Sequence, residues 1–180
     1  FLASTLWPTN PSLPPPILYG LFKDWAGAAP YDPASVPVRI YAEMRTASAH
    51  ALVQMSDELC SIVAELRKVL PANVHLQNDF SMQACVNENY KEQITCSYNA
   101  VTSVITNKAF GKHNIPYTQV EGGVVPTLKH KFFETDLPFG LCTFKDIANM
   151  LKLEVPLIDA MIRWNQKLIG KTYLADDGSL

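Results

Sequence analysis

The pattern of apolar and polar residues is clearest between residues 38 and 70, where mainly apolar residues recur every three or four positions. Charged residues such as Glu43, Asp57 and Lys68 fall between them. Because this spacing places side chains on one face of an α-helix, residues 38–70 are predicted to form one long amphipathic helix that ends near Pro71. The positions expected to be buried on that face are Tyr41, Met44, Leu52, Met55, Leu59, Ile62 and Leu66.

Several shorter segments show the same spacing, or carry residues that typically begin and end helices. Pro156 suits a first helical turn, where its missing N–H has no intrahelical partner, and Gly170 suits the position after a last turn. Thr143, with the acidic Asp146 three residues on, is typical of a helix start. The further helices predicted are residues 17–25, residues 80–89, residues 92–105, a helix from Thr143 through Leu151, and residues 156–169.

The remaining segments are rich in proline and glycine. Residues 1–16 contain too many prolines for a helix or a central strand, so an extended entry segment is predicted there. Residues 27–37 and 111–126 are predicted to be loops. No useful strand alternation and no internal repeat is present. The predicted fold class is therefore all-α: a single helical bundle-like domain over residues 1–180 with one long central helix.

Charge and cysteine content exclude several functional classes. The net charge of −2 gives no electrostatic footprint for nucleic acid or an anionic membrane, and no apolar run is long enough to span a bilayer. Cys60, Cys85, Cys96 and Cys142 lie far apart, with no CxxC pair. A structural zinc site or a disulfide framework is therefore not expected. Four reduced, mostly buried thiols in a cytoplasmic protein are predicted instead.

No nucleotide-binding signature is present either. There is no GxGxxG after a strand, and the only adjacent glycines, Gly122 and Gly123, lie in a predicted loop. The chain is therefore expected not to hold a dinucleotide cofactor by itself. GxSxG and HExxH motifs are also missing. Since the sequence begins at Phe1 rather than at methionine, an element is expected to be missing upstream.

Five segments together resemble the opine dehydrogenases. Residues 136–148 (DLPFGLCTFKDIA) are similar to the family's acidic ED(V/I)P(Y/F)GL segment and the helix after it. Residues 155–159 (VPLID) and 170–174 (GKTYL) are similar to its P-x-I-D helix start and GK-x-Y ending. Residues 103–110 match a TN-x-Y/F helix end, and residues 10–20 (NPSLPPPILYG) match the entry segment NP-x-x-HP-x-I-x-YG. The resemblance covers nearly the whole chain.

The resemblance implies an oxidoreductase as the full-length protein. Enzymes of the family join an N-terminal Rossmann domain, which binds NAD, to a helical C-terminal domain that supplies most of the substrate site. This chain would be the second domain, inactive alone, with the absent Rossmann domain of the same protein as its partner. In the family, an amino acid condenses with an α-keto acid such as pyruvate, and hydride from the nicotinamide reduces the resulting imine.

The resemblance also implies roles for individual residues. Asp136 matches the catalytic carboxylate that orients and polarises the base; a simpler interpretation is an acid that caps a neighbouring turn. Lys131 stands where the family has an arginine, so a point charge replaces a two-pronged guanidinium for binding substrate carboxylate. A solvated basic residue is the alternative for Lys131. Asn10, in the entry segment, would bind substrate.

The base itself is the largest departure from the family, because the family's histidine aligns with Pro14. Proline can neither accept nor donate a proton. The protein could be a diverged relative with reduced or altered activity, or another group, such as His130 beside Lys131, could have taken over the role. A shift of the proline-rich alignment by a residue or two is the third interpretation, although no histidine lies nearby.

Two other functions remain open. One is another NAD(P) dehydrogenase with a Rossmann domain and a helical domain, of the glycerol-3-phosphate or 2-hydroxyacid type. The other is a catalytically silent homologue kept as a binding or structural protein, which Pro14 and Lys131 favour. A strand–GxGxxG–helix unit upstream would support either enzyme.

Overall fold

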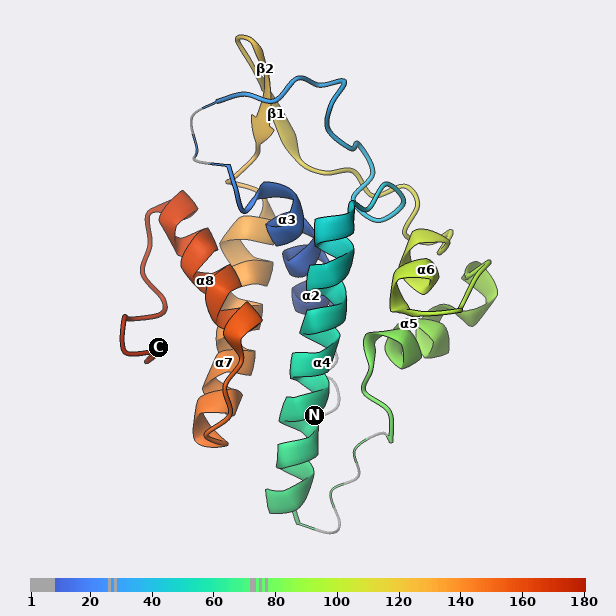
Figure 1. The fold of residues 1–180 in the computed structure, drawn as a ribbon, viewed down its shortest axis with the longest axis vertical. Coiled ribbons are helices and arrows are strands. Elements are labelled where there is room, and N and C mark those ends of the chain that lie inside the picture. Colours follow the sequence, from blue (N-terminus) through green and yellow to red (C-terminus); the bar gives the residue numbers. More distant parts are fainter. Residues whose placement is uncertain (1–8, 26, 28, 72–73, 75, 77) are drawn as a thin grey trace.

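The computed structural model describes residues 9–25, 27, 29–71, 74, 76 and 78–180 of the chain, and Figure 1 shows them as a mostly helical assembly with one small hairpin. The prediction of an all-α class is confirmed. The elements are α2 (Thr9–Ser12), α3 (Pro14–Phe22), α4 (Thr46–Val69), α5 (Met82–Tyr90), the 3₁₀-helix η1 (Lys91–Gln93), α6 (Ala100–Ile105), β1 (Tyr117–Val120), β2 (Gly123–Pro126), the π-helix η2 (Phe132–Gly140), α7 (Leu141–Met150) and α8 (Pro156–Ile169).

Helix α4 is the long central helix that the spacing predicted. In Figure 1 it stands between α7 and α8 on one side and α5 and α6 on the other. Its buried face carries four of the expected residues, Leu52, Met55, Leu59 and Ile62. Helix α3 crosses it closely, and η2, α7 and α8 complete the core. The buried face of α4 is thus the surface against which the core helices pack.

The predicted start of this helix was wrong, because α4 begins at Thr46 and not at residue 38. Residues 38–40 instead pair with a distant loop. Ile115 N donates to Val38 O (2.9 Å), and Ile40 N donates to His113 O (3.0 Å). Tyr41 is buried as expected, but from this turn rather than from the helix, and Met44 and Leu66 are only partly buried. Tertiary pairing therefore overrides a local helical pattern.

The proline-rich segment was also predicted wrongly where it is described. Residues 9–12 and 14–22 are helical rather than extended, and Trp7 lies outside the described residues. Pro14, Pro15 and Pro16 occupy the first turn of α3. Backbone N–H groups there have no intrahelical acceptor, so three prolines cost no hydrogen bond and their fixed φ favours the helix.

Two further segments depart from the predictions. Of residues 92–105, only η1 and α6 are helical; Asn99 forms a reciprocal capping box with Thr102 and sets the start of α6. The predicted loop 111–126 contains an antiparallel hairpin of β1 and β2. Its turn holds Gly122 and Gly123 at φ of 85° and 150°, where other residues would be strained.

The C-terminal helices match the predictions more closely. Helix α8 begins at Pro156 and ends before Gly170, whose φ of 66° is the expected left-handed cap. The helix predicted from Thr143 begins two residues earlier, and it continues directly from η2. Pro138 lies inside η2. At Gly140 a side chain would collide with Pro11, so η2 and α2 pack in close contact.

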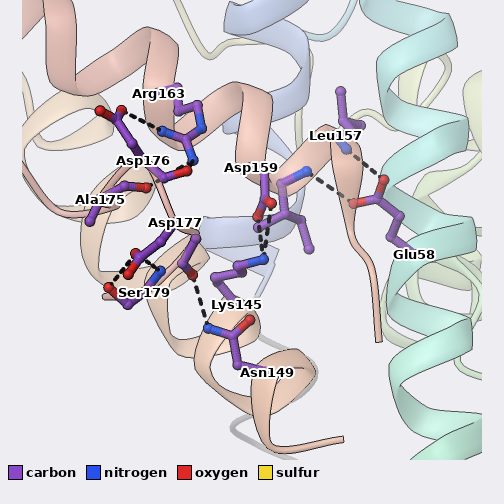
Figure 2. A network of polar contacts seen from close by, with 12 residues as sticks. Glu58, Lys145, Asn149, Leu157, Asp159, Arg163, Ala175, Asp176, Asp177 and Ser179 are labelled. Atoms are coloured by element: carbon purple, nitrogen blue, oxygen red, sulfur yellow. Dashed lines mark hydrogen bonds and ion pairs between the residues drawn. The ribbon is translucent and has the colours of Figure 1, made fainter. Parts of the chain in front are cut away.

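A polar network ties α8 to the rest of the core. Figure 2 shows the carboxylate of Glu58 in α4 facing the first turn of α8, where it accepts hydrogen bonds from Leu157 N (2.7 Å) and Ile158 N (3.0 Å). Lys145 of α7 forms an ion pair with Asp159 at 2.9 Å. Glu58 is only 8% exposed. An acid of α4 therefore caps a helix about a hundred residues further along the chain.

The crossing of α3 and α4 allows a test by substitution. A Cβ on Gly20 would lie 2.5 Å from the Ser48 backbone. We expect Gly20→Ala to lower the free energy of unfolding by about 1–3 kcal/mol, because the two helices must move apart. Gly111→Ala is the matched control, since its Cβ would lie 3.7 Å from Lys108 O, an ordinary van der Waals contact. Urea denaturation checks both variants; equal stability of the two would show that the crossing is not tight.

Candidate functional site

The first residues of the described chain border a small pocket. Asn10 of α2 lines a cavity of about 200 Å³, together with Leu13, Tyr41, Phe110 and His113. We call this cavity the α2 pocket. Its wall is drawn from segments far apart in the sequence, and the pairing of residues 38–40 with residues 113–115 brings two of them together. Asn10 is exposed, so its amide is free to face a ligand there.

Asp136 lies half-buried in η2. Its Oδ2 atom is buried and has no hydrogen-bond partner among the described residues. Burial raises the pKa of Asp136 above its ordinary value, while Lys131 and His130 act in the opposite direction. Burial and the charge of Asp136 also raise the pKa of Tyr41. Tyr41 therefore links the carboxylate to the α2 pocket, whose wall it forms.

Lys131 and His130 precede Asp136 by about one turn. Lys131 is exposed, lies with its ammonium 5.5 Å from the centre of the Phe132 ring, and forms no ion pair within the described part of the chain. His130 Nδ1 accepts a hydrogen bond from Phe132 N (3.3 Å). Burial lowers the pKa of His130, Lys131 lowers it further, and Asp136 opposes both. The charges of an ammonium, an imidazole and a carboxylate thus act on one another around the first half of η2.

Pro14 is buried at the first position of α3. Its neighbour Leu13 lines the α2 pocket, so the position where the entry motif has histidine lies beside that pocket. The sequence analysis missed two residues of this region, Tyr41 and His113. Tyr41 had been assigned to a helix face, and His113 stood in a segment predicted to be a loop. Only the long-range pairing of their segments reveals them.

The described residues do not fit the pyrophosphate of a dinucleotide. Such a group needs a glycine turn that leads from a strand into a helix N-terminus. Gly122 and Gly123 instead form the turn of the β1–β2 hairpin. The residues that precede α3, α4, α5, α6 and α8 are Leu13, Arg45, Ser81, Asn99 and Val155, and Gly140 lies within continuous helix between η2 and α7.

The thiols are poor candidates for chemistry. All four cysteines are free; Cys85 is buried, Cys60 and Cys142 are half-buried, and Cys96 is exposed. The prediction of mostly buried thiols is therefore correct only in part. Burial raises the pKa of Cys85 to about 12 and that of Cys142 to about 11, which disfavours the reactive thiolate.

The described ranges contain neither a metal-binding cluster nor a membrane-spanning helix. No three or more histidine, cysteine or acidic side chains among these residues are placed to bind a metal ion together. None of the helices in the same ranges combines the length and the apolar character that crossing a membrane requires.

The comparisons with known proteins define the class. The family described as NAD/NADP octopine/nopaline dehydrogenase, alpha-helical domain, matches residues 1–169. The chain therefore belongs to the octopine/nopaline dehydrogenase family and corresponds to its alpha-helical domain. Among curated relatives it is 30% identical to an octopine dehydrogenase of Mizuhopecten yessoensis over 162 residues, and 30% identical to a tauropine dehydrogenase of Arabella iricolor over 174 residues.

These alignments cover most of this chain but less than half of each relative. They span 90% and 96% of the chain, and 39% and 43% of the two relatives. A solved octopine dehydrogenase in complex with NADH and agmatine superposes with a TM-score of 0.81 at 27% identity, over 93% of this chain and 40% of that one. A second, described as a complex with NADH and L-arginine, gives 0.80 at the same identity and coverage.

Proposed function

We propose that this chain is the substrate-binding and catalytic domain of an NAD-dependent opine dehydrogenase-like oxidoreductase. The reaction joins the amino group of an amino acid to the carbonyl carbon of an α-keto acid such as pyruvate and reduces the product of that condensation. A nicotinamide cofactor, bound by an N-terminal Rossmann domain outside this chain, would supply the hydride. The chain's own task is to bind both substrates and to move protons.

The observation that carries the proposal is the environment of Asp136. A half-buried carboxylate with an unpartnered oxygen stands close to the unpaired ammonium of Lys131 and to Tyr41 of the α2 pocket. Burying a carboxylate oxygen without a hydrogen-bond partner is unfavourable, and groups with perturbed pKa values cluster at functional sites. Both substrates carry carboxylates, which Lys131 would hold as a point charge. Asn10 would donate a hydrogen bond to the substrate from the wall of the α2 pocket.

The test is oxidation of NADH by the full-length protein. Pyruvate is supplied with a panel of amino acids, and absorbance is followed with each amino acid in turn. The proposal expects oxidation only when an amino acid and pyruvate are both present. The 180-residue chain alone is the control, and it should neither bind nor oxidise NADH. Oxidation with pyruvate alone would indicate a 2-hydroxyacid dehydrogenase instead.

A catalytically silent homologue is the second candidate, and the buried Pro14 favours it. Such a protein would bind an α-keto acid or an amino acid without oxidising NADH. Calorimetric titration with pyruvate separates the two candidates, because binding without turnover supports only the silent protein.

The charge of Lys131 leads to a prediction about pH. Lys131 lowers the pKa of Asp136, so Lys131→Gln should raise that pKa and cause the carboxylate to be lost at a higher pH. If the reaction requires the ionised carboxylate, the acid limb of the kcat/KM profile shifts to higher pH in the variant. Lys129→Gln, two residues earlier and also exposed, is the control and should leave the limb in place. A shift of the acid limb to lower pH in the Lys131 variant would contradict the prediction.

A further inference from the structure

We propose that His113 is the base that takes the proton from the substrate ammonium in the α2 pocket. This inference rests on the proposed function and adds a catalytic residue to it. His113 lines the same pocket as Asn10 and Leu13, and Leu13 is the direct neighbour of Pro14. An imidazole is thus present beside the position at which the chain has a proline.

The backbone of His113 is anchored on both sides. Its carbonyl accepts a hydrogen bond from Ile40 N (3.0 Å), and its N–H donates to Phe110 O (3.1 Å). The imidazole ring stands edge-on to Tyr41 at a centroid distance of 5.7 Å. A positioned base needs this kind of fixed ring, because proton transfer depends on geometry before it depends on pKa.

A hydrogen bond also fixes the tautomer of His113. Nδ1 lies 3.1 Å from Phe110 O. Since a carbonyl oxygen can only accept, Nδ1 must carry the hydrogen in the neutral ring. The lone pair is then on Nε2, and no described residue forms a hydrogen bond with that atom. His113 is exposed, so Nε2 is accessible to a substrate.

His130, the other histidine near the site, has the opposite arrangement. Its Nδ1 accepts the hydrogen bond from Phe132 N, so its lone pair is already engaged. In the neutral ring Nε2 then carries the hydrogen, and His130 can donate from that atom but cannot receive a proton there. The structure therefore favours His113 over His130 as the base, although His130 is the closer neighbour of Asp136 in the sequence.

The proton balance of the step is simple. Nε2 of His113 takes one proton from the ammonium of the amino acid, which frees the nitrogen lone pair. That nitrogen forms a C–N bond with the keto carbon while the C=O π bond breaks, and one N–H proton then passes to the alkoxide oxygen, which gives a neutral carbinolamine. The imidazolium returns its proton to the carbinolamine hydroxyl, the C–O bond breaks, and water leaves. The products are an iminium ion, water and neutral His113, with the charge unchanged overall.

The charged and titratable groups near His113 come from three segments. Tyr41 and Tyr90 line the α2 pocket with it, and Asp136 acts on Tyr41. Arg39 donates to Lys112 O (2.8 Å) and to the side chain of Asn114, on either side of His113 in sequence. The guanidinium thus lies along the same loop, so variants at Arg39 are not suitable controls.

The experiment compares His113→Asn with His130→Asn in the full-length protein. The asparagine amide can still donate to Phe110 O but offers no basic nitrogen, so the fold is retained while the base is lost. Loss of a positioned base should lower kcat/KM for the amino acid by about 10²-fold or more. His130→Asn should lower kcat/KM far less than His113→Asn does, because its amide oxygen can still accept from Phe132 N and His130 is not the base. Added imidazole should restore part of the activity of His113→Ala, which a structural role of the residue does not predict.

The outcomes separate the inference from the proposed function. A parent protein that is inactive with every amino acid overturns both. An active parent that is unaffected by His113→Asn overturns the inference alone, as does a variant that loses activity without any rescue of His113→Ala by imidazole. A large loss in His113→Asn, a much smaller loss in His130→Asn and rescue of His113→Ala by imidazole together support it. Circular dichroism of each variant confirms that the comparison is made on folded protein.

Discussion

Glu58→Ala is expected to lower the free energy of unfolding by about 2–4 kcal/mol. The substitution removes the carboxylate that accepts hydrogen bonds from Leu157 N and Ile158 N, and it leaves both buried donors without a partner. It also opens a small void between α4 and α8. Chemical denaturation of the 180-residue chain measures the loss directly.

Two comparisons sharpen this prediction. Burial raises the pKa of Glu58, although the two backbone hydrogen bonds oppose the shift, so the ionised form is held at some cost. Glu58→Gln keeps one oxygen acceptor and removes that cost, and it should therefore lose less stability than alanine. Glu65→Ala, a substitution of a half-buried acid in the same helix, removes only an ion pair with Lys68 and should change stability by about 0.5 kcal/mol at most. Equal effects at positions 58 and 65 would rule out the capping role.

Asp136→Asn is expected to lower kcat/KM of the full-length protein by about 10²-fold or more. The amide keeps the shape of the side chain but removes the negative charge that would polarise the base through Tyr41 and the surrounding groups. The expected effect on stability has the opposite sign. A carboxyl whose pKa is raised on folding subtracts from stability at any pH above that pKa, so the asparagine variant should be at least as stable as the parent near neutral pH.

This combination of lower activity and unchanged or higher stability is the distinctive result. Glu134→Gln, an exposed acid in the same helix, is the matched control and should change neither quantity. Steady-state kinetics and thermal unfolding of the three proteins test the prediction. If the Asp136 variant unfolds more easily and also loses activity, the carboxylate is a structural cap, as its simpler interpretation holds.

Periodicity was enough to predict the parts of the fold that depend on local sequence. The core face of α4 and the two ends of α8 follow from spacing, from Pro156 and from Gly170. The errors have a common cause. Residues 38–45 continue the helical spacing, but Val38 O bonds to Ile115 N and Ile40 N bonds to His113 O, and no local pattern contains that information. The hairpin was missed because each strand is only four residues long and one of them is largely exposed.

The residues of the candidate site also fall into those that local sequence indicates and those that only the fold brings together. Asp136, Lys131 and Asn10 stand in short motifs that can be aligned without a structure. Tyr41 and His113 stand in no motif, and they enter the site because two segments about seventy residues apart pair with each other. A residue of that kind is visible only after the fold is known. The direction of each histidine's lone pair likewise depends on a carbonyl or an N–H that the sequence does not place.

The π-helix at Phe132–Gly140 makes the length of this segment as important as its composition. Each of its hydrogen-bonded rings contains one residue more than a ring of an α-helix. Deleting a single residue after Asp136 would allow the segment to close into an α-helix. Since successive residues of an α-helix are about 100° apart, Asp136 would then turn by about that angle relative to α7 and away from Tyr41. Insertions and deletions here should therefore be selected against more strongly than substitutions, even substitutions of the exposed residues.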